Sequence, residues 1–129
     1  MSRDFDLIVW GATGFTGQLV VEYLANTYGV DGDLRWAIAG RNEAKLEELR
    51  SALDMPDLPL IVADSSDRAS LEEMVTRTRV ICTTVGPYAL YGEPMVKACA
   101  QSGTDYVDLT GEPQWIHEML VKYEATAKG

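Results

Sequence analysis

The fold is decided by the segment Leu7-Ile8-Val9-Trp10-Gly11-Ala12-Thr13-Gly14-Phe15-Thr16-Gly17-Gln18-Leu19-Val20. Its first four residues are apolar and predict a buried parallel strand, and a helical pattern begins directly after the glycines. A strand, a glycine turn and a helix in this order bring backbone N–H groups and the positive end of a helix against a phosphate. We expect Gly11 to permit the tight turn, Gly14 to admit a pyrophosphate, and Gly17 to let helix and strand pack closely. The segment therefore predicts a dinucleotide site, with a purely structural strand-to-helix turn as the alternative. The residues predicted to contact the dinucleotide here are Gly11, Thr13, Gly14, Phe15, Thr16 and Gly17.

Strands and helices alternate five times along the chain, with no repeat or low-complexity segment. This alternation predicts an α/β fold, a doubly wound parallel sheet of the Rossmann type with strand order 3-2-1-4-5 and helices on both faces. A ligand should then lie where the strand order reverses, over the carboxyl ends of the first and fourth strands. The loop after the fourth strand is predicted to contact it through Val85, Gly86, Pro87 and Tyr88. The expected strands are Phe5–Trp10, Leu34–Ala39, Leu60–Ala63, Val80–Val85 and Tyr106–Leu109.

Composition and charge narrow the class of protein. The 129 residues, 47% of them apolar, fit one compact domain over residues 1–129 and leave little room for a second. A net charge of −9 argues against nucleic acid and anionic membrane surfaces as partners, because both attract positive charge. No apolar run approaches the roughly 20 residues of a membrane span, and the N-terminal residues match no signal peptide. Cys82 and Cys99 fall in apolar patterns, so we expect two core cysteines, no disulfide and a cytoplasmic location.

The end of the second strand discriminates between cofactors. An NAD site usually has an acidic residue there to hold the ribose 2′-hydroxyl, but this chain has Gly40-Arg41-Asn42. A guanidinium can make two charge-assisted hydrogen bonds to a 2′-phosphate, each contributing roughly 1.5–3 kcal/mol. Gly40, Arg41 and Asn42 are therefore predicted to bind NADP(H) in preference to NAD(H). The alternative for Arg41 is a solvated arginine at the start of a helix.

Two polar residues leave the third strand. Asp64 and Ser65 are placed to contact the adenine, and an equally good interpretation makes them turn formers before the next helix. Ser70 and Glu73 have the spacing of a capping box and predict the start of that helix.

The sequence offers no dedicated acid–base residues. No tyrosine is followed by a lysine four positions later, and the single histidine, His117, is expected to be a surface residue of the last helix. Tyr88 and Tyr91 are near the expected position of the nicotinamide. They could gate it, but packing of the loop is the favoured interpretation. One histidine and two separated cysteines predict no metal site. Catalytic residues therefore stay unassigned.

Four motifs occur in a characteristic order. They are 11–17, Ala39-Gly40-Arg41-Asn42, 85–88 and 106–112. Together they resemble the saccharopine dehydrogenase-like oxidoreductases, a group that includes the trans-acting enoyl reductases of lipid synthesis. The resemblance extends over nearly the whole chain and implies an NADP-dependent oxidoreductase. The glycine turn differs from that of true saccharopine reductases, so saccharopine is not implied as the substrate.

The resemblance also bears on domain organisation. In this family the cofactor domain continues into a further strand and a large second domain that shapes the substrate site. We therefore expect this chain to correspond to the N-terminal cofactor domain and to be inactive alone. The fifth strand would then be an unpaired edge, through which the chain could self-associate unless the last helix covers it. A non-enzymatic dinucleotide-binding or redox-sensing module is the alternative function, and a methyltransferase fits the glycine spacing less well.

Overall fold

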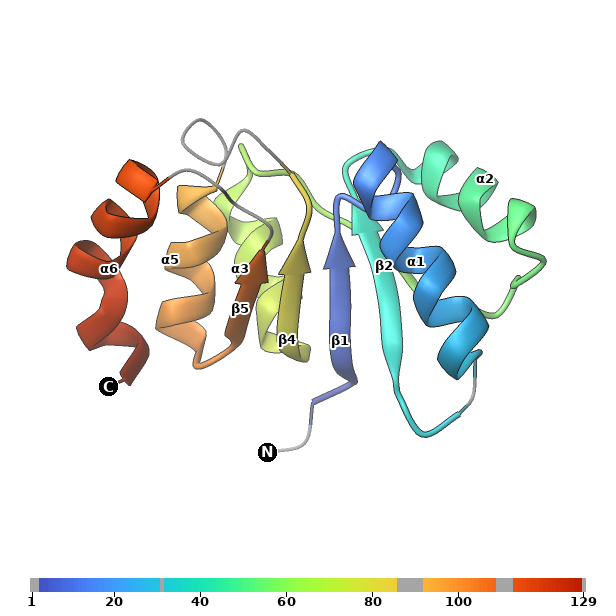
Figure 1. Cartoon of the computed structure of the whole chain (residues 1–129), viewed down its shortest axis with the longest axis horizontal. Coiled ribbons are helices and arrows are strands. Elements are labelled where there is room, and N and C mark those ends of the chain that lie inside the picture. The colour runs from blue at the N-terminus through green and yellow to red at the C-terminus, as the bar shows by residue number, and fades with distance from the viewer. Residues whose placement is uncertain (1–2, 31, 86–91, 109–112, 129) are drawn as a thin grey trace.

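The computed structural model describes residues 3–30, 32–85, 92–108 and 113–128 (Figure 1). The described strands form one sheet of order β3-β2-β1-β4-β5, in which every neighbouring pair is parallel. The strands are β1 (Phe5–Trp10), β2 (Trp36–Gly40), β3 (Leu60–Val62), β4 (Thr78–Thr83) and β5 (Asp105–Asp108). The helices are α1 (Phe15–Tyr28), α2 (Glu43–Ala52), α3 (Arg68–Thr76), α5 (Glu93–Ser102) and α6 (Pro113–Lys128). The predicted doubly wound α/β fold and its strand order are confirmed.

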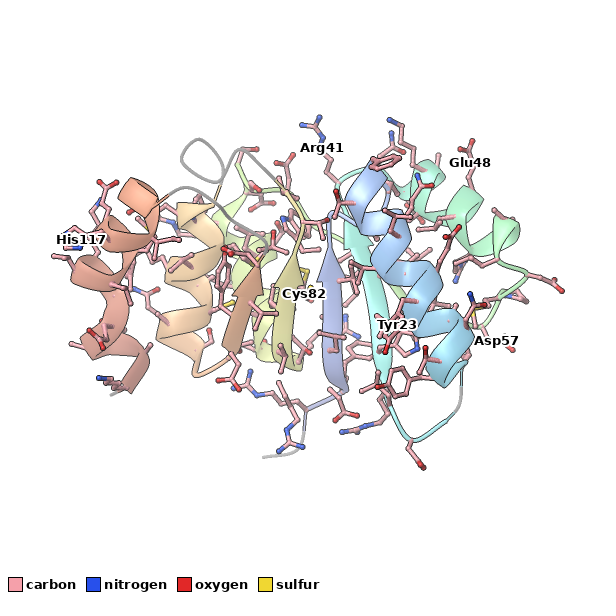
Figure 2. The ribbon with its side chains drawn as sticks, in the orientation of Figure 1. Tyr23, Arg41, Glu48, Asp57, Cys82 and His117 are labelled. Atoms are coloured by element: carbon pink, nitrogen blue, oxygen red, sulfur yellow. The ribbon has the colours of Figure 1, made fainter. Side chains whose placement is uncertain are left out.

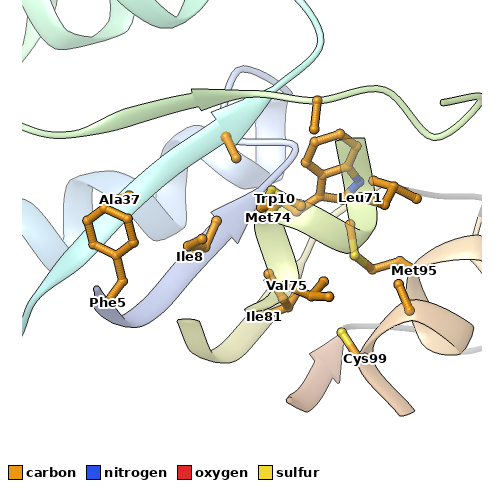
Figure 3. Packing of buried hydrophobic residues seen from close by; sticks show 13 residues of the cluster. Phe5, Ile8, Trp10, Ala37, Leu71, Met74, Val75, Ile81, Met95 and Cys99 are labelled. Atoms are coloured by element: carbon orange, nitrogen blue, oxygen red, sulfur yellow. The ribbon is translucent and has the colours of Figure 1, made fainter. Parts of the chain in front are cut away.

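Two hydrophobic clusters cover the two faces of the sheet. Side chains alternate along β1, so Ile8 packs with α3 and α5 on one face while Val9 packs with α1 and α2 on the other. Both side chains are 0% exposed, as expected for the central strand of a parallel sheet. Figure 3 shows the cluster under α3 and α5, where Met74 and Met95 pack beside Trp10. The carboxyl end of β1, which leads into the glycine turn, is thus held by packing on both faces of the sheet.

The sheet edge at β5 is only partly covered. In the described residues β5 pairs with β4 alone, and α6 packs beside α5 (Figure 1). Met119 of α6 is buried against Val96 and Tyr123, and Val107 of β5 remains 48% exposed. Self-association through this edge stays a prediction.

A hydrogen bond of α6 fixes it to α5. The Tyr123 hydroxyl donates to Glu93 Oε2 at 2.6 Å, and Lys122 Nζ lies 3.4 Å from the same carboxylate. The Tyr123 hydrogen bond lowers the pKa of Glu93, and the Glu93 carboxylate raises the pKa of Tyr123 to about 12. Both partners therefore keep the ionisation state that holds the two helices together at neutral pH.

At the amino ends of the strands, Arg3 connects three segments. Its guanidinium donates to the carbonyl oxygens of Val75 at 2.8 Å and Thr78 at 2.9 Å. It also donates to the Thr104 hydroxyl and the Ser102 carbonyl, both at 2.7 Å. Arg3 thereby satisfies carbonyls at the C-terminal ends of α3 and α5 that have no partner within their own helices.

The start of α3 differs from the sequence-based expectation. Helix α3 begins at Arg68 with Asp67 as its N-cap, so the predicted capping box at Ser70 is wrong. The Ser70 hydroxyl is taken by the carbonyls of Asp67 and Asp64, at 2.7 and 3.2 Å, which leaves the Asp67 carboxylate to cap the helix.

The two cysteines are free, and they differ in burial. Cys99 is a core residue as predicted, and burial raises its pKa to about 12. Cys82 is only half-buried, because it alternates with Ile81 and faces the side of the sheet where α1 and α2 lie over β1 and β2 (Figure 1). Among the described helices, none is both long and apolar enough to cross a membrane. In the same residues, no group of three histidine, cysteine or acidic side chains is arranged to hold a metal ion.

Candidate functional site

The glycine turn is tied to the second strand by its first two amides. Gly11 has a φ of +81°, which strongly favours glycine, and its N–H donates to the Ala39 carbonyl at 3.0 Å. The N–H of Ala12 donates to the same carbonyl at 3.2 Å, and the N–H of Gly14 donates to Gly11 O at 3.1 Å. These three amides hold the turn in shape and are not available to a ligand.

The amides that remain are those at the start of α1. The first hydrogen bond of this helix runs from Gln18 N to Gly14 O at 2.9 Å. Within the described part of the chain, the N–H groups of Thr13, Phe15 and Thr16 have no hydrogen-bond partner. Such groups at a helix N-terminus carry partial positive charge and favour an anion. We therefore expect these amides to be the ones that contact the predicted phosphate.

The other two glycines differ in how closely the backbone approaches them. A Cβ atom on Gly17 would overlap the Gly11 carbonyl oxygen and lie 2.9 Å from Ala12 Cα. A Cβ atom on Gly14 would meet nothing closer than Gly11 O at 3.5 Å. Gly17 therefore permits close packing of α1 on the turn, while a Cβ atom on Gly14, the N-cap of α1, would make only an ordinary van der Waals contact.

A cleft of about 460 Å³ opens beside the turn, at the carboxyl ends of β1, β2 and β4. It lies where the strand order reverses, the position predicted for the ligand. Figure 2 shows Arg41 at this end of the sheet, above β1 and β2. Eight of the predicted site residues meet here: Gly11, Thr13, Gly14, Gly40, Arg41, Asp64, Ser65 and Val85.

Four further predicted site residues that the structure describes do not line this cleft. Phe15 is 84% exposed, and Thr16 is exposed beside it, although its amide faces the same helix terminus. Gly17 is buried behind the turn. Asn42 caps α2 by accepting a hydrogen bond from Lys45 N at 3.1 Å. The predictions for Gly86, Pro87 and Tyr88, and the gating role weighed for Tyr91, lie outside the described residues.

Opposite charges face each other on the cleft wall. Arg41 is exposed and forms no ion pair with any residue that the structure describes. Asp64 accepts hydrogen bonds from the amide and the hydroxyl of Ser66, both at 2.9 Å. These bonds, and the charge of Arg41, lower the pKa of Asp64, which is therefore ionised at neutral pH. The turn-forming role considered for Asp64 is present in the structure, and a contact with adenine stays a prediction.

Sequence reasoning missed two residues of the cleft wall, Trp10 and Thr84. The Thr84 hydroxyl donates to the carbonyls of Trp10 at 3.2 Å and Gly11 at 3.1 Å. We expected Thr84 to be part of the fourth strand, but β4 ends at Thr83. Only the pairing of β4 with β1 brings Thr84 beside the glycine turn, and no local pattern signals that contact.

A second hollow, of about 530 Å³, lies between α5, β5 and α6. It is lined mainly by apolar side chains, among them Val96, Met119 and Leu120. It shares no residue with the cleft at the glycine turn, and it lies beside the uncovered edge of β5.

Residues 7–129 match the family described as the saccharopine dehydrogenase NADP binding domain. The chain belongs to this family. The match includes the glycine turn, Arg41 and the fifth strand, so the resemblance inferred from four motifs is confirmed. The predicted preference for NADP(H) agrees with the cofactor of the family.

Individual relatives are also similar to this chain in sequence. A protein of Caenorhabditis elegans named "Lipid droplet localized protein" is 47% identical over 99% of this chain and 31% of its own length. The "Trans-acting enoyl reductase" of Mycobacterium ulcerans is also 47% identical, over 97% of this chain and 30% of its own length. The chain thus spans about a third of the length of these relatives. The name of the first relative places that protein at lipid droplets, and the cytoplasmic location expected here stays a prediction.

Among solved structures, saccharopine dehydrogenase from Saccharomyces cerevisiae superimposes with a TM-score of 0.69 and 21% identity. The alignment covers 88% of this chain and 23% of that one. Triphenylmethane reductase from Citrobacter, solved with NADP(H), gives a TM-score of 0.67 and 19% identity over 95% of this chain and 45% of that one. These two likenesses support the fold.

Proposed function

We propose that the cleft between the glycine turn and Arg41 binds NADP(H), and that this chain is the cofactor-binding part of a longer oxidoreductase. The observation that carries the proposal is that two anion-binding features meet at one cleft, which Arg41 lines and which the N-terminus of α1 reaches through Thr13 and Gly14. The unpaired amides at the start of α1 suit a pyrophosphate, and the Arg41 guanidinium suits a 2′-phosphate. A bare helix terminus would bind many anions, but this pair matches a ligand with phosphate groups at two separate positions.

The cleft residues fit the cofactor. Gly14 adds no side chain at the N-cap of α1, and Gly40, the last residue of β2, is followed by Arg41 and Asn42 with no carboxylate at this position to repel a 2′-phosphate. Asp64 is the acidic residue of the cleft wall, and Ser66 holds its carboxylate through two hydrogen bonds. Thr13, Phe15 and Thr16 would hold the pyrophosphate through their amides, and Arg41 would hold the 2′-phosphate.

The reaction we propose is hydride transfer. When bound, the nicotinamide supplies the hydride, and the protein has to bind, orient and shield it. The cleft wall carries an ionised Asp64 and a Thr84 hydroxyl that is already donating, so neither is free to protonate a substrate. We therefore assign substrate binding and proton transfer to the remaining part of the longer protein. The names of the mycobacterial relatives favour reduction of an enoyl double bond.

Thermal unfolding tests the binding step. A ligand that binds only the folded chain raises its unfolding temperature as the ligand concentration increases. We expect NADPH to stabilise the chain and NADH to stabilise it less at equal concentration. ADP-ribose, which has no 2′-phosphate, should resemble NADH. If none of the three changes the unfolding temperature, the proposal is wrong.

Activity distinguishes an oxidoreductase from a binding module. With an enoyl thioester, the longer protein should oxidise NADPH, while the 129-residue chain should bind NADPH and leave it unoxidised. If the longer protein binds NADPH but does not oxidise it with any enoyl or carbonyl substrate tested, the alternative of a non-enzymatic module is favoured.

A further inference from the structure

The peptide unit between Gly11 and Ala12 is held at both ends by different strands. On the side of β2, the Ala12 N–H donates to the Ala39 carbonyl at 3.2 Å. On the side of β4, the Gly11 carbonyl accepts from the Thr84 hydroxyl at 3.1 Å, and it also accepts from Gly14 N at 3.1 Å. The turn is therefore held from both sides, by Ala39 of β2 and by Thr84, the residue that follows β4.

This peptide needs such a clamp because of its glycine. Gly11 has a φ of +81°, and a glycine can change its backbone angles at little steric cost. A rotated Gly11–Ala12 peptide would present its carbonyl oxygen in a new direction and would release the Gly14 amide. The amides of Thr13, Phe15 and Thr16 follow directly in the chain, so their positions depend on this peptide.

The space around Gly11 leaves little tolerance. A Cβ atom on Gly11 would lie 2.6 Å from Val85 Cγ2 and 3.0 Å from Thr84 Oγ1. Thr84 also donates its backbone N–H to the Trp10 carbonyl at 3.1 Å, which fixes its main chain against the end of β1. The hydroxyl is thereby held at the carbonyls of both Trp10 and Gly11.

We propose that Thr84 is a positioning residue for the dinucleotide: its hydroxyl holds the Gly11 carbonyl so that the amides after it stay arranged for a pyrophosphate. The inference rests on the proposed NADP(H) site. Thr84 acts through the backbone of the turn, so its effect should be limited to ligands that carry a pyrophosphate. The Arg41 side of the cleft does not depend on this hydrogen bond.

The test compares Thr84→Val and Thr84→Ser with the unchanged chain by isothermal titration with NADPH. Valine keeps the shape of threonine but cannot donate, and serine keeps the hydroxyl. We expect Thr84→Val to raise the Kd for NADPH about three- to tenfold, the range for one lost hydrogen bond, and Thr84→Ser to leave it within about twofold. If Thr84→Val does not fold, Thr84→Ala can be compared with Thr84→Ser, because alanine and serine also differ only in the hydroxyl group.

Two controls separate positioning from general stability. Adenosine 2′-phosphate has no pyrophosphate, so the Thr84→Val variant should bind it as the unchanged chain does in an NMR titration. Thr78→Val removes a buried hydroxyl from the first residue of β4, at the end of the strand away from Thr84. This hydroxyl donates to Val80 O at 3.1 Å. That variant should unfold at a lower temperature and bind NADPH normally.

Each result decides between the inference and the function on which it rests. If the chain binds NADPH and Thr84→Val binds it equally well, the positioning role is wrong and the proposed function stands. Equal weakening of NADPH and adenosine 2′-phosphate also overturns the positioning role, because the whole cleft has then changed. If the unchanged chain does not bind NADPH, the proposed function is wrong and the role of Thr84 fails with it.

Discussion

The Gly11 carbonyl oxygen occupies the space that a Cβ atom on Gly17 would need. The first residue of the turn and the third residue of α1 are thus in direct backbone contact, which brings the start of α1 against the end of β1. Gly14 lies between them in the chain, and a Cβ atom there would make only an ordinary contact, with Gly11 O at 3.5 Å. We therefore expect the two glycines to have separable roles, Gly17 in folding and Gly14 in ligand access.

Gly17→Ala should destabilise the chain. The added methyl group meets backbone atoms on both Gly11 and Ala12, which cannot move aside as a flexible side chain could. We expect the free energy of unfolding in urea to fall by about 3 kcal/mol, at the upper end of overpacking costs. A variant as stable as the unchanged chain would show that α1 does not approach the turn this closely.

Gly14→Ala should instead impair binding. Gly14 has a φ of −73°, which alanine adopts readily, and its Cβ would make only an ordinary contact at 3.5 Å. We expect stability to fall by less than about 1 kcal/mol, as for other changes at an N-cap, while the affinity for NADPH falls at least about tenfold. Unchanged affinity would place the dinucleotide away from the N-terminus of α1.

Arg41→Ala should change cofactor selectivity. Loss of the guanidinium removes its hydrogen bonds to the 2′-phosphate, so we expect at least about tenfold weaker binding of NADPH and nearly unchanged binding of NADH. Arg35→Ala is the matched control, because this exposed arginine pairs with Asp6 at the amino end of the sheet, 3.2 Å away. Equal losses for the two cofactors in Arg41→Ala would reject the role of Arg41.

Arg3→Ala should destabilise the chain without affecting the site. Its guanidinium makes four half-buried hydrogen bonds that join α3, β4 and α5. We expect a loss of about 2–4 kcal/mol in urea unfolding, because three carbonyl groups and a buried threonine hydroxyl lose a charged partner. Arg3→Lys should recover part of this loss, and both variants should keep the Kd for NADPH.

Stability should depend on acid through Glu93. Its pKa is lowered in the folded chain, chiefly by the Tyr123 hydrogen bond, so its contribution is complete above about pH 4.3 and is lost as the pH falls through the lowered value. Tyr123→Phe removes that hydrogen bond. The difference in unfolding free energy between the two chains should therefore be larger at neutral pH than at about pH 3. A difference that is the same at both values would show that the carboxylate does not stabilise α6.

The sequence predicted those features that depend on residues near one another in the chain. The apolar run before Gly11 and the alternation of elements were sufficient for the strand order, because few topologies fit that pattern. Gly11 and Gly17 have the roles expected from their spacing. Arg41 could be placed in the cleft because it directly follows a strand whose carboxyl end faces the site.

Other features depend on contacts between distant segments. Thr84 lies 73 residues from Gly11 in the chain, and its hydrogen bond exists only because β4 pairs with β1. The start of α3 was placed wrongly because Ser70 and Asp67 are both good N-caps, and the Asp64 carbonyl decides between them by accepting from Ser70. The choice between these two N-caps thus depends on a local hydrogen bond, between residues six apart, that the capping pattern does not include.

The most direct test of the NADP(H) site is calorimetric titration of the 129-residue chain with NADPH and with NADH, followed in parallel by tryptophan fluorescence. Trp10 lines the cleft, while the indole of Trp36 donates to the Gly29 carbonyl away from it. We predict saturable one-to-one binding of NADPH, at least about tenfold tighter than that of NADH, with a fluorescence change that Trp10→Phe abolishes and Trp36→Phe retains. Absence of heat and of a fluorescence change with NADPH, in a chain shown to be folded, would contradict the account.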